Sequence, residues 1–158
     1  GFKKHGALVV SQQNVNPNRL IEVPLPDITY MDTVFNPAAR GVKSKDRDAV
    51  PYHDYLLLST PTKTMVLETK EELAEVSGQV EFLTDSATLL CKNMFGNKLV
   101  AQVCPRSVRL VQNGKLKQEL KGADIGAEGT VAVADAAVAD TMVLLRLSDG
   151  TARLLVRD

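Results

Sequence analysis

Two cysteines and two histidines are the side chains of this sequence best suited to nucleophilic or metal chemistry. Cys91 and Cys104 lie thirteen residues apart without a CxxC pair or a nearby pair of histidines, so their spacing argues against a zinc site. We expect both to be buried free thiols in a reducing compartment. His5 and His53 have no carboxylate, serine or cysteine partner at a spacing that would make either a general base.

Catalytic motifs are absent from the rest of the sequence. The turn "VCPRS" at residues 103–107 brings a cysteine near a serine, but nothing supplies a base to activate either side chain. The GxGxxG, P-loop and HExxH motifs do not occur. The sequence therefore predicts no catalytic residue, no cofactor and no metal site, and it predicts that the protein is not an enzyme.

The charge balance argues against a protein that binds nucleic acid mainly through phosphates. Lysine and arginine total 19, aspartate and glutamate also total 19, and aromatic residues make up 4% with no tryptophan. The remaining candidates for contact with a partner or RNA are four basic residues of one loop and two arginines around one predicted strand: Arg40, Lys43, Lys45, Arg47, Arg106 and Arg109. Asp46 and Asp48 partly cancel the field of that loop, so a solvated loop is the competing interpretation.

The 158 residues suit one domain. The sequence shows no signal peptide and no apolar run of about 18 residues, which predicts an intracellular, soluble protein without a membrane partner. The first residue is glycine rather than methionine, so we expect a fragment or a processed chain.

Internal repetition is the main structural signal. Blocks that begin at Tyr55, Lys98 and Thr141 are spaced 43 residues apart, and each consists of an apolar run, a short polar turn and a second apolar run. A more charged segment follows the first two blocks. In the second block, Asn113–Gly114 predicts a two-residue hairpin, because both central residues of a type I′ turn need positive φ.

The stretch "TKTMVLETKEELAEV" at residues 62–76 admits two interpretations. Thr69 and Glu72 have capping-box spacing, and Leu73 and Val76 would share one face of a helix. The repeat instead aligns "ELAEV" with "KLKQEL" after the predicted hairpin, which indicates two strands joined by a tight turn. We predict strands.

A fourth copy lies near the N-terminus, where "HGALVVSQQ" (5–13) matches "KTMVLETK" and "RLIEVPLP" (19–26) matches "ELAEV". Its larger offset is explained by the polar segment 35–53, which we expect to be a mobile insertion in one repeat. The strands that precede the aligned blocks are predicted at 25–35, 86–95 and 129–138, although the last is alanine-rich and could be helical by propensity.

Four short strands every 40 to 45 residues are typical of a β-propeller blade. We predict an all-β fold, a divergent WD40-like β-propeller in an incomplete ring of about three to four four-stranded blades. The partial propeller spans 1–158, with blade units at about 1–26, 27–78 (with loop insertion 35–53), 86–121 and 129–158. The runs "YLLL" and "MVLLRL" are continuously apolar, as inner strands covered on both faces would be. Because propellers close with about four or more blades, we expect exposed apolar faces at the terminal blades and further blades elsewhere in a parent chain.

Three segments resemble the large subunit of the cleavage and polyadenylation specificity factor. They are "HDYLLLSTPTKTMVLETKEELAEV" (53–76), "FGNKLVAQVCPRSVRLVQNGKLKQEL" (95–120) and "VADTMVLLRLSDGTARLL" (138–155). The upstream "KKHGALVVSQQ" (3–13) is similar to the strand that precedes a variable insertion in that family. Two departures stand out, namely "DSATLL" in place of a Gly-Pro-Thr-like entry, and Thr141 and Met142 in place of an aromatic residue after "VAD".

The resemblance implies part of the middle one of three propellers in a nuclear scaffold for pre-mRNA 3′-end processing. It implies as partners a CCCH zinc-finger subunit and a WD-repeat subunit, which read the polyadenylation hexamer, and an endonuclease module, with pre-mRNA contacted mostly indirectly. The related propellers of the damaged-DNA-binding ubiquitin-ligase adaptor and of splicing factor 3b share the architecture and stay open as alternatives, as does a module that binds RNA directly.

Overall fold

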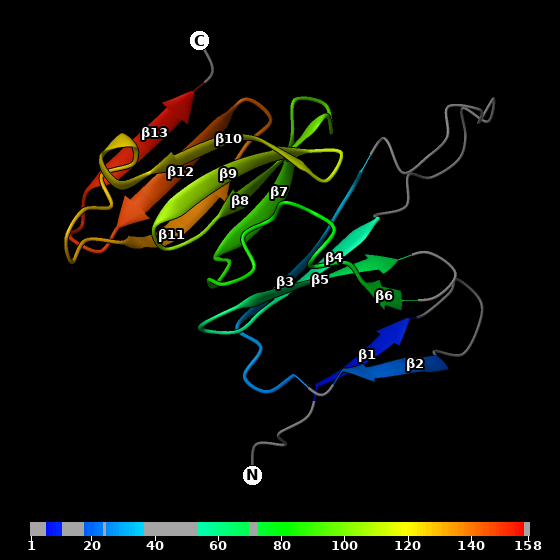
Figure 1. Ribbon diagram of the computed structural model, residues 1–158. Coiled ribbons are helices and arrows are strands. Elements are labelled where there is room, and N and C mark those ends of the chain that lie inside the picture. Colours follow the sequence, from blue (N-terminus) through cyan, green and yellow to red (C-terminus); the bar gives the residue numbers. More distant parts are fainter. Residues whose placement is uncertain (1–5, 11–17, 24, 37–53, 70–72, 157–158) are drawn as a thin grey trace.

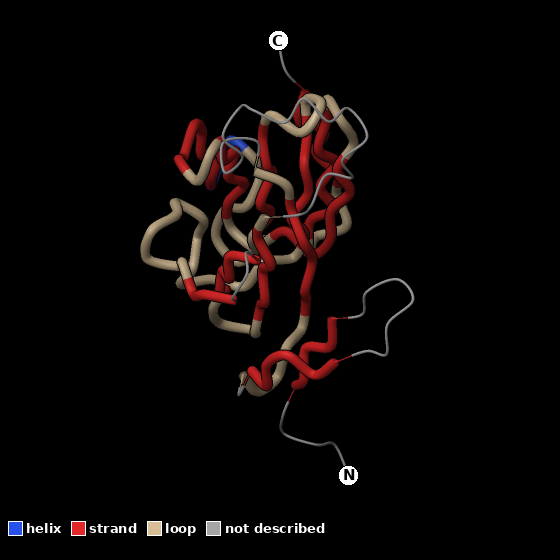
Figure 2. Tube along the Cα trace, turned by 90° about the vertical axis from the view of Figure 1, so that its right-hand side faces the viewer, coloured by secondary structure: helices blue, strands red, loops and turns tan. Residues whose placement is uncertain are grey.

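The computed structural model describes residues 6–10, 18–23, 25–36, 54–69 and 73–156, the first two ranges by backbone alone. The described chain is built of strands, with one 3₁₀ turn, η2 (Gly122–Asp124), among them (Figures 1 and 2). The all-β prediction is confirmed. The strands form one two-stranded hairpin and three antiparallel sheets that do not close into a ring (Figure 1).

The sheets follow one another along the chain. The hairpin pairs β1 (Gly6–Val10) with β2 (Asn18–Val23). The first sheet contains β3 (Tyr30–Val34), β4 (Tyr55–Ser59), β5 (Thr64–Thr69) and β6 (Leu73–Glu75). The second sheet contains β7 (Leu90–Met94), β8 (Leu99–Val103), β9 (Ser107–Gln112) and β10 (Lys115–Lys121). The third sheet contains β11 (Val133–Val138), β12 (Met142–Leu147) and β13 (Ala152–Val156), and in every sheet each strand pairs with the next one in sequence.

Within the stretch 62–76, Thr64–Thr69 and Leu73–Glu75 form strands, as predicted, so the helical interpretation is wrong; the predicted turn at 70–72 lies outside the described residues. β5 pairs with β4 so that Val66 lies opposite Leu57, and Leu67 to Thr69 pair with β6. Leu57 and Val66 are fully buried. Capping-box spacing is a local signal. As a strand between β4 and β6, β5 pairs its backbone hydrogen-bonding groups and buries its apolar side chains, and these gains outweigh the local helical preference.

The predicted hairpin at Asn113–Gly114 is also confirmed. Asn113 has φ 54° and Gly114 has φ 74°, the pair of positive values that a type I′ turn requires. The turn joins β9 to β10, with Gln112 opposite Lys115.

The first strands of the sheets are shorter than predicted. The expected strands 25–35, 86–95 and 129–138 are observed as β3, β7 and β11, each beginning four or five residues later. The residues before them form turns that cross from the preceding sheet. Val131 N–H, for example, donates to Glu128 O within a turn, so the strand predicted from residue 129 begins only after this turn.

Both faces of β4 are covered, as its continuous apolar run predicted, because all five of its residues are buried. Tyr55 and Leu57 pack toward the second sheet with Cys91 and Val100. The run "MVLLRL" is different. β12 alternates between exposed and buried residues, since only one face of the third sheet is covered by the described chain.

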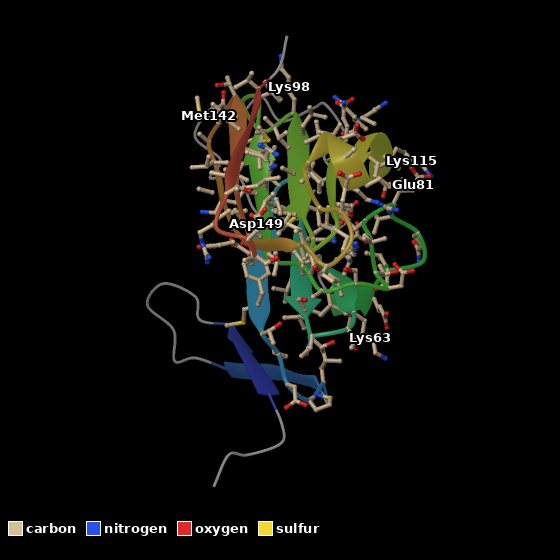
Figure 3. All side chains as sticks on the ribbon, turned by 90° about the vertical axis from the view of Figure 1, so that its left-hand side faces the viewer. Lys63, Glu81, Lys98, Lys115, Met142 and Asp149 are labelled. Atoms are coloured by element: carbon tan, nitrogen blue, oxygen red, sulfur yellow. The ribbon has the colours of Figure 1, made fainter. Side chains whose placement is uncertain are left out.

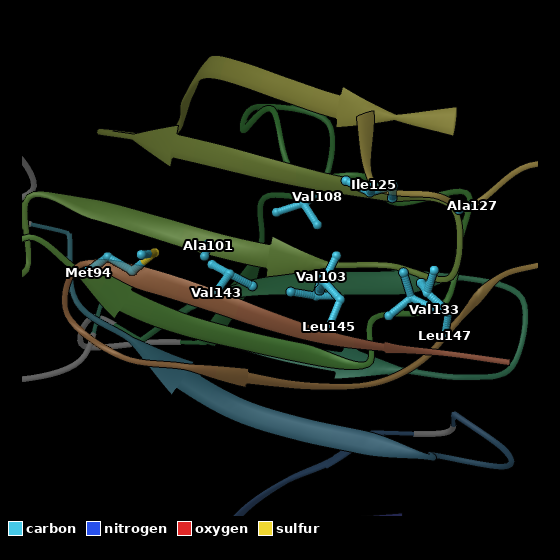
Figure 4. Close-up of a cluster of buried hydrophobic side chains, with 10 residues drawn as sticks. All are labelled: Met94, Ala101, Val103, Val108, Ile125, Ala127, Val133, Val143, Leu145 and Leu147. Atoms are coloured by element: carbon cyan, nitrogen blue, oxygen red, sulfur yellow. The ribbon is translucent and has the colours of Figure 1, made fainter. Parts of the chain in front are cut away.

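The second and third sheets share the other large core, which contains ten buried residues (Figure 4). Ala101, Val103 and Val108 face Val143 and Leu145 across it. The segment that follows β10 adds Ile125, which is completely buried. The sheets are therefore held together by apolar side chains contributed both by the strands and by the crossing segments between them.

Gly126 is expected to tolerate no side chain. Its φ is +76°, and a Cβ would lie 2.9 Å from Leu147 Cδ1 and 3.0 Å from Arg153 Nε. We expect Gly126→Ala to lower the free energy of unfolding by roughly 2 kcal/mol or more, since left-handed backbone alone costs an L-residue about 1–2 kcal/mol. The matched control is Gly129→Ala, which has φ +57° but open space around the Cβ, so it isolates the backbone contribution. Equal losses in urea titrations of the two variants would mean that the contact with Leu147 is unimportant.

Candidate functional site

The structure places two of the six basic candidates. Arg40, Lys43, Lys45 and Arg47 lie outside the described residues, as do His5 and His53. Arg106 lies in the turn between β8 and β9, and Arg109 lies within β9.

Arg106 and Arg109 are directed at the protein itself. The guanidinium of Arg106 donates to Gly129 O at 2.7 Å, in the segment that leads into the third sheet. Arg109 donates to Glu119 Oε1 at 2.9 Å and to Glu81 O at 3.3 Å, in the segment that arrives from the first sheet. The two arginines thus serve different neighbours and do not form one basic patch with each other. Their contact with RNA stays a prediction.

The ion pair of Arg109 with Glu119 should make stability depend on pH. The hydrogen bond from Arg109 holds the pKa of the Glu119 carboxyl below its usual value. A lowered carboxyl pKa contributes stability that is present at neutral pH and is lost as the pH falls through that pKa. We expect Glu119→Gln to lower the free energy of unfolding by about 0.5–1 kcal/mol at pH 7, the range of a partly exposed pair, with the difference shrinking as the pH falls and vanishing below the lowered pKa of Glu119. Glu128→Gln, an exposed position with no ion pair to a described residue, is the control, and an equal effect there would contradict the assignment.

The two cysteines are buried free thiols, as predicted. Burial raises the pKa of the Cys104 thiol to about 11 and raises that of Cys91 well above its ordinary value. Because the thiolate is the reactive form, both side chains are poor nucleophiles at neutral pH.

A buried polar network between the first and second sheets was not predicted from the sequence. Gln102 on β8 is fully buried, and its amide forms two hydrogen bonds with the backbone of Leu83, at 2.7 and 2.9 Å. The same amide donates to Thr88 Oγ1 at 2.8 Å, and that hydroxyl lies 2.7 Å from Thr64 Oγ1 of β5. Thr88 N–H donates in turn to Ser59 Oγ at the end of β4. The one signal in the sequence is a glutamine inside the apolar run "KLVAQVC".

Two further contacts fix the same pair of sheets. The Tyr30 hydroxyl on β3 accepts from Cys91 N–H at 2.8 Å, and burial raises the pKa of this phenol far above its usual value. The amide of Asn93 on β7 bonds both to N–H and to C=O of Phe35, each at 2.8 Å. Satisfied buried networks of this kind are directional, so they set the position of one sheet on the next in a way that apolar packing alone does not.

The third sheet carries four of the five large apolar side chains that are exposed among the described residues, and the fifth is Met31 of β3. We call Met142 and Leu144 of β12 and Leu154 and Val156 of β13 the open face. Met142 pairs with Val156 and Leu144 with Leu154, so the four side chains share one side of the sheet (Figure 3 labels Met142). They are 40 to 58% exposed. An exposed apolar patch of neighbouring residues is the usual mark of a protein contact.

Within the described ranges, no group of three His, Cys, Asp or Glu side chains is arranged to hold a metal ion. No helix among the described residues is long and apolar enough to cross a membrane.

Successive antiparallel sheets, each packed face to face on the next, define the class of the β-propellers. The chain matches the family described as "RSE1/DDB1/CPSF1 second beta-propeller" over residues 17–158, and it belongs to that family. The predicted β-propeller fold is thereby confirmed.

The resemblance drawn from the sequence is confirmed by individual relatives. The chain is 36% identical to the cleavage and polyadenylation specificity factor subunit 1 of Arabidopsis thaliana, over all of its length and 12% of that protein. It is 35% identical to the probable subunit 1 of Oryza sativa, over all of its length and 11% of the relative. The Drosophila melanogaster subunit 1 is 31% identical over 95% of the chain and 10% of the relative. The chain thus spans about a tenth of these relatives.

Proposed function

We propose that this chain is a noncatalytic propeller segment of the cleavage and polyadenylation machinery, where it acts as a scaffold for other subunits. The observation that carries the proposal is the similarity to subunit 1 of the cleavage and polyadenylation specificity factor across the whole chain in two plants. Because pre-mRNA 3′ ends are processed in the nucleus, the proposal includes a nuclear location.

The geometry supports a scaffold rather than a reaction centre. Bonds that involve Gln102, Tyr30 and Asn93 position the first two sheets rigidly, and the described cysteines are buried and protonated. The open face offers apolar surface for a protein contact. The function of a propeller lies in the surfaces that it presents, since the fold itself carries no activity.

The proposed partners are a CCCH zinc-finger subunit, a WD-repeat subunit and the endonuclease module. In this arrangement pre-mRNA is contacted mostly through those subunits, which agrees with the net charge of zero. The family description also names RSE1 and DDB1, so the ubiquitin-ligase adaptor and the splicing subunit are the competing assignments.

Affinity purification of the full natural protein tests the proposal. We expect polyadenylation factors to co-purify with it at near-stoichiometric levels, before and after nuclease treatment. Recovery of a cullin ligase or of spliceosomal proteins in their place would overturn the assignment. Loss of every partner upon nuclease treatment would favour direct RNA binding over a scaffold held by protein contacts.

A further inference from the structure

A cleft of about 310 Å³ lies between the second and third sheets. Nine of the twelve residues that line it are apolar, and they include Leu99, Leu110 and Leu120 of the second sheet and Leu155 and Val156 of the third. This volume lies at the lower end of the range typical of ligand sites, and it accommodates a single apolar side chain of a partner.

The junctions on the two sides of the second sheet are filled by different residues. Between the first and second sheets, Tyr55 begins β4 and packs edge-on against Phe82, with ring centroids 6.1 Å apart. Leu99 begins β8 in the same way, and Ile125 is the buried residue that the next crossing segment contributes. Leu99 lines the cleft, whereas Ile125 is completely buried and lies outside its lining.

One positive charge lines the cleft and is not paired within the described part of the chain. Lys117 is its only charged lining residue, and this lysine makes no ion pair with a described residue. The lysines on either side of it are already paired, Lys115 with Glu81 at 3.5 Å and Lys121 with Glu119 at 3.4 Å (Figure 3 labels Lys115 and Glu81). A carboxylate brought to the cleft would therefore meet an ammonium group that pairs with no described acidic side chain, and no acidic lining residue.

The wall of the cleft nearest the β7–β8 turn is held in an unusual conformation. Phe95, Gly96 and Asn97 all have positive φ, at 52°, 60° and 66°. Asp140 fixes this turn, since Phe95 N–H donates to Asp140 O at 2.8 Å and Gly96 N–H donates to Asp140 Oδ1 at 2.7 Å. A phenylalanine in left-handed backbone is unfavourable and persists only where its surroundings enforce it, as they commonly do at binding sites. Here it places the aromatic ring in the lining of the cleft.

We propose that this cleft binds an acidic protein segment, with one apolar side chain of the segment seated between the sheets and a neighbouring carboxylate paired with Lys117. The apolar lining of the cleft favours an apolar side chain of the partner, and Lys117 favours a carboxylate next to it. The proposal goes beyond the scaffold function and does not depend on which complex contains the protein.

The test uses the full natural chain and a fluorescein-labelled peptide, acetyl-Glu-Glu-Leu-Glu-Glu-amide, in an anisotropy titration. We expect saturable binding that weakens with added salt, and weaker binding of the peptide in which serine replaces leucine. Lys117→Glu should weaken binding by about 5-fold, the factor that corresponds to a surface ion pair at the upper end of the usual range. The matched control is Lys92→Glu, an exposed lysine of β7 that does not line the cleft and should leave the affinity unchanged.

Three results would overturn the proposal. They are no saturable binding, equal binding of the leucine and serine peptides, and equal losses in the Lys117 and Lys92 variants. A photo-cross-linking residue at Gln118 identifies a different occupant. If Gln118→benzoylphenylalanine cross-links within the same polypeptide or to a second copy, and the peptide does not compete, then the cleft is already filled and the proposal is wrong. None of these readouts involves polyadenylation factors, so failure here is separate from failure of the proposed function.

Discussion

Replacing Gln102 with leucine is expected to lower the free energy of unfolding by about 2–4 kcal/mol. The two side chains have similar volumes, so little packing is lost. The buried backbone groups of Leu83 and the hydroxyl of Thr88 would lose their amide partner, however, and each buried polar group left unsatisfied costs about 1–3 kcal/mol. Urea unfolding followed by circular dichroism measures the effect.

The control for this variant is Gln118→Leu, the same chemical change on an exposed position of β10. We expect a change within about 0.5 kcal/mol there, as for most surface substitutions. A Gln102 variant that is as stable as the Gln118 variant would show that the network contributes specificity but no net stability, as has been measured for some buried polar groups.

Truncating Leu57 to alanine should be equally damaging for a different reason. Leu57 is completely buried in the core between the first and second sheets, opposite Val66. Leucine-to-alanine changes at such sites cost about 2–5 kcal/mol, because the transfer free energy is lost and a cavity remains.

Leu154→Ala on the open face is the matched control for Leu57→Ala. Leu154 also lies in a strand, but it is 57% exposed, so we expect a loss of less than about 0.5 kcal/mol. A loss below about 1 kcal/mol for Leu57→Ala would mean that the pairing of β4 with β5 is wrong.

Local pairing is the part of the fold that the sequence predicted well. The 43-residue spacing and the Asn113–Gly114 turn both report on hairpins, in which the partners are close in sequence. The starts of β7 and β11 were placed too early, because the residues before them look like strand by composition but bond to the preceding sheet or within turns. Thr88 N–H, for example, donates to Ser59 Oγ of β4, and Val131 N–H donates to Glu128 O.

Features that depend on distant segments could not be predicted. In the sequence, Gln102 is one polar residue in an apolar run. Nothing there indicates that Gln102 bonds to Leu83 and Thr88, or that Thr88 bonds in turn to Thr64. Lys117 of the cleft was missed as well, since the pairing of the nearby Lys115 with Glu81 joins two segments that are distant in sequence. The sequence also does not show that Arg106 lies beside the carbonyl of Gly129, or that Arg109 lies beside the carboxylate of Glu119. The four loop residues between 40 and 47 lie outside what the structure describes.

The stacking of the sheets has a direction. Leu57 faces from the first sheet to the second, Ala101 faces from the second to the third, and Leu144 occupies the outward side of the third. A head-to-tail contact of this kind can be repeated any number of times. If the repeats close into a ring, addition of further sheets stops. Without closure, the same contact generates an open-ended filament. Molecules whose open face is uncovered are therefore at risk of fibrous assembly, and a single charge introduced at Leu144 would act as a terminator.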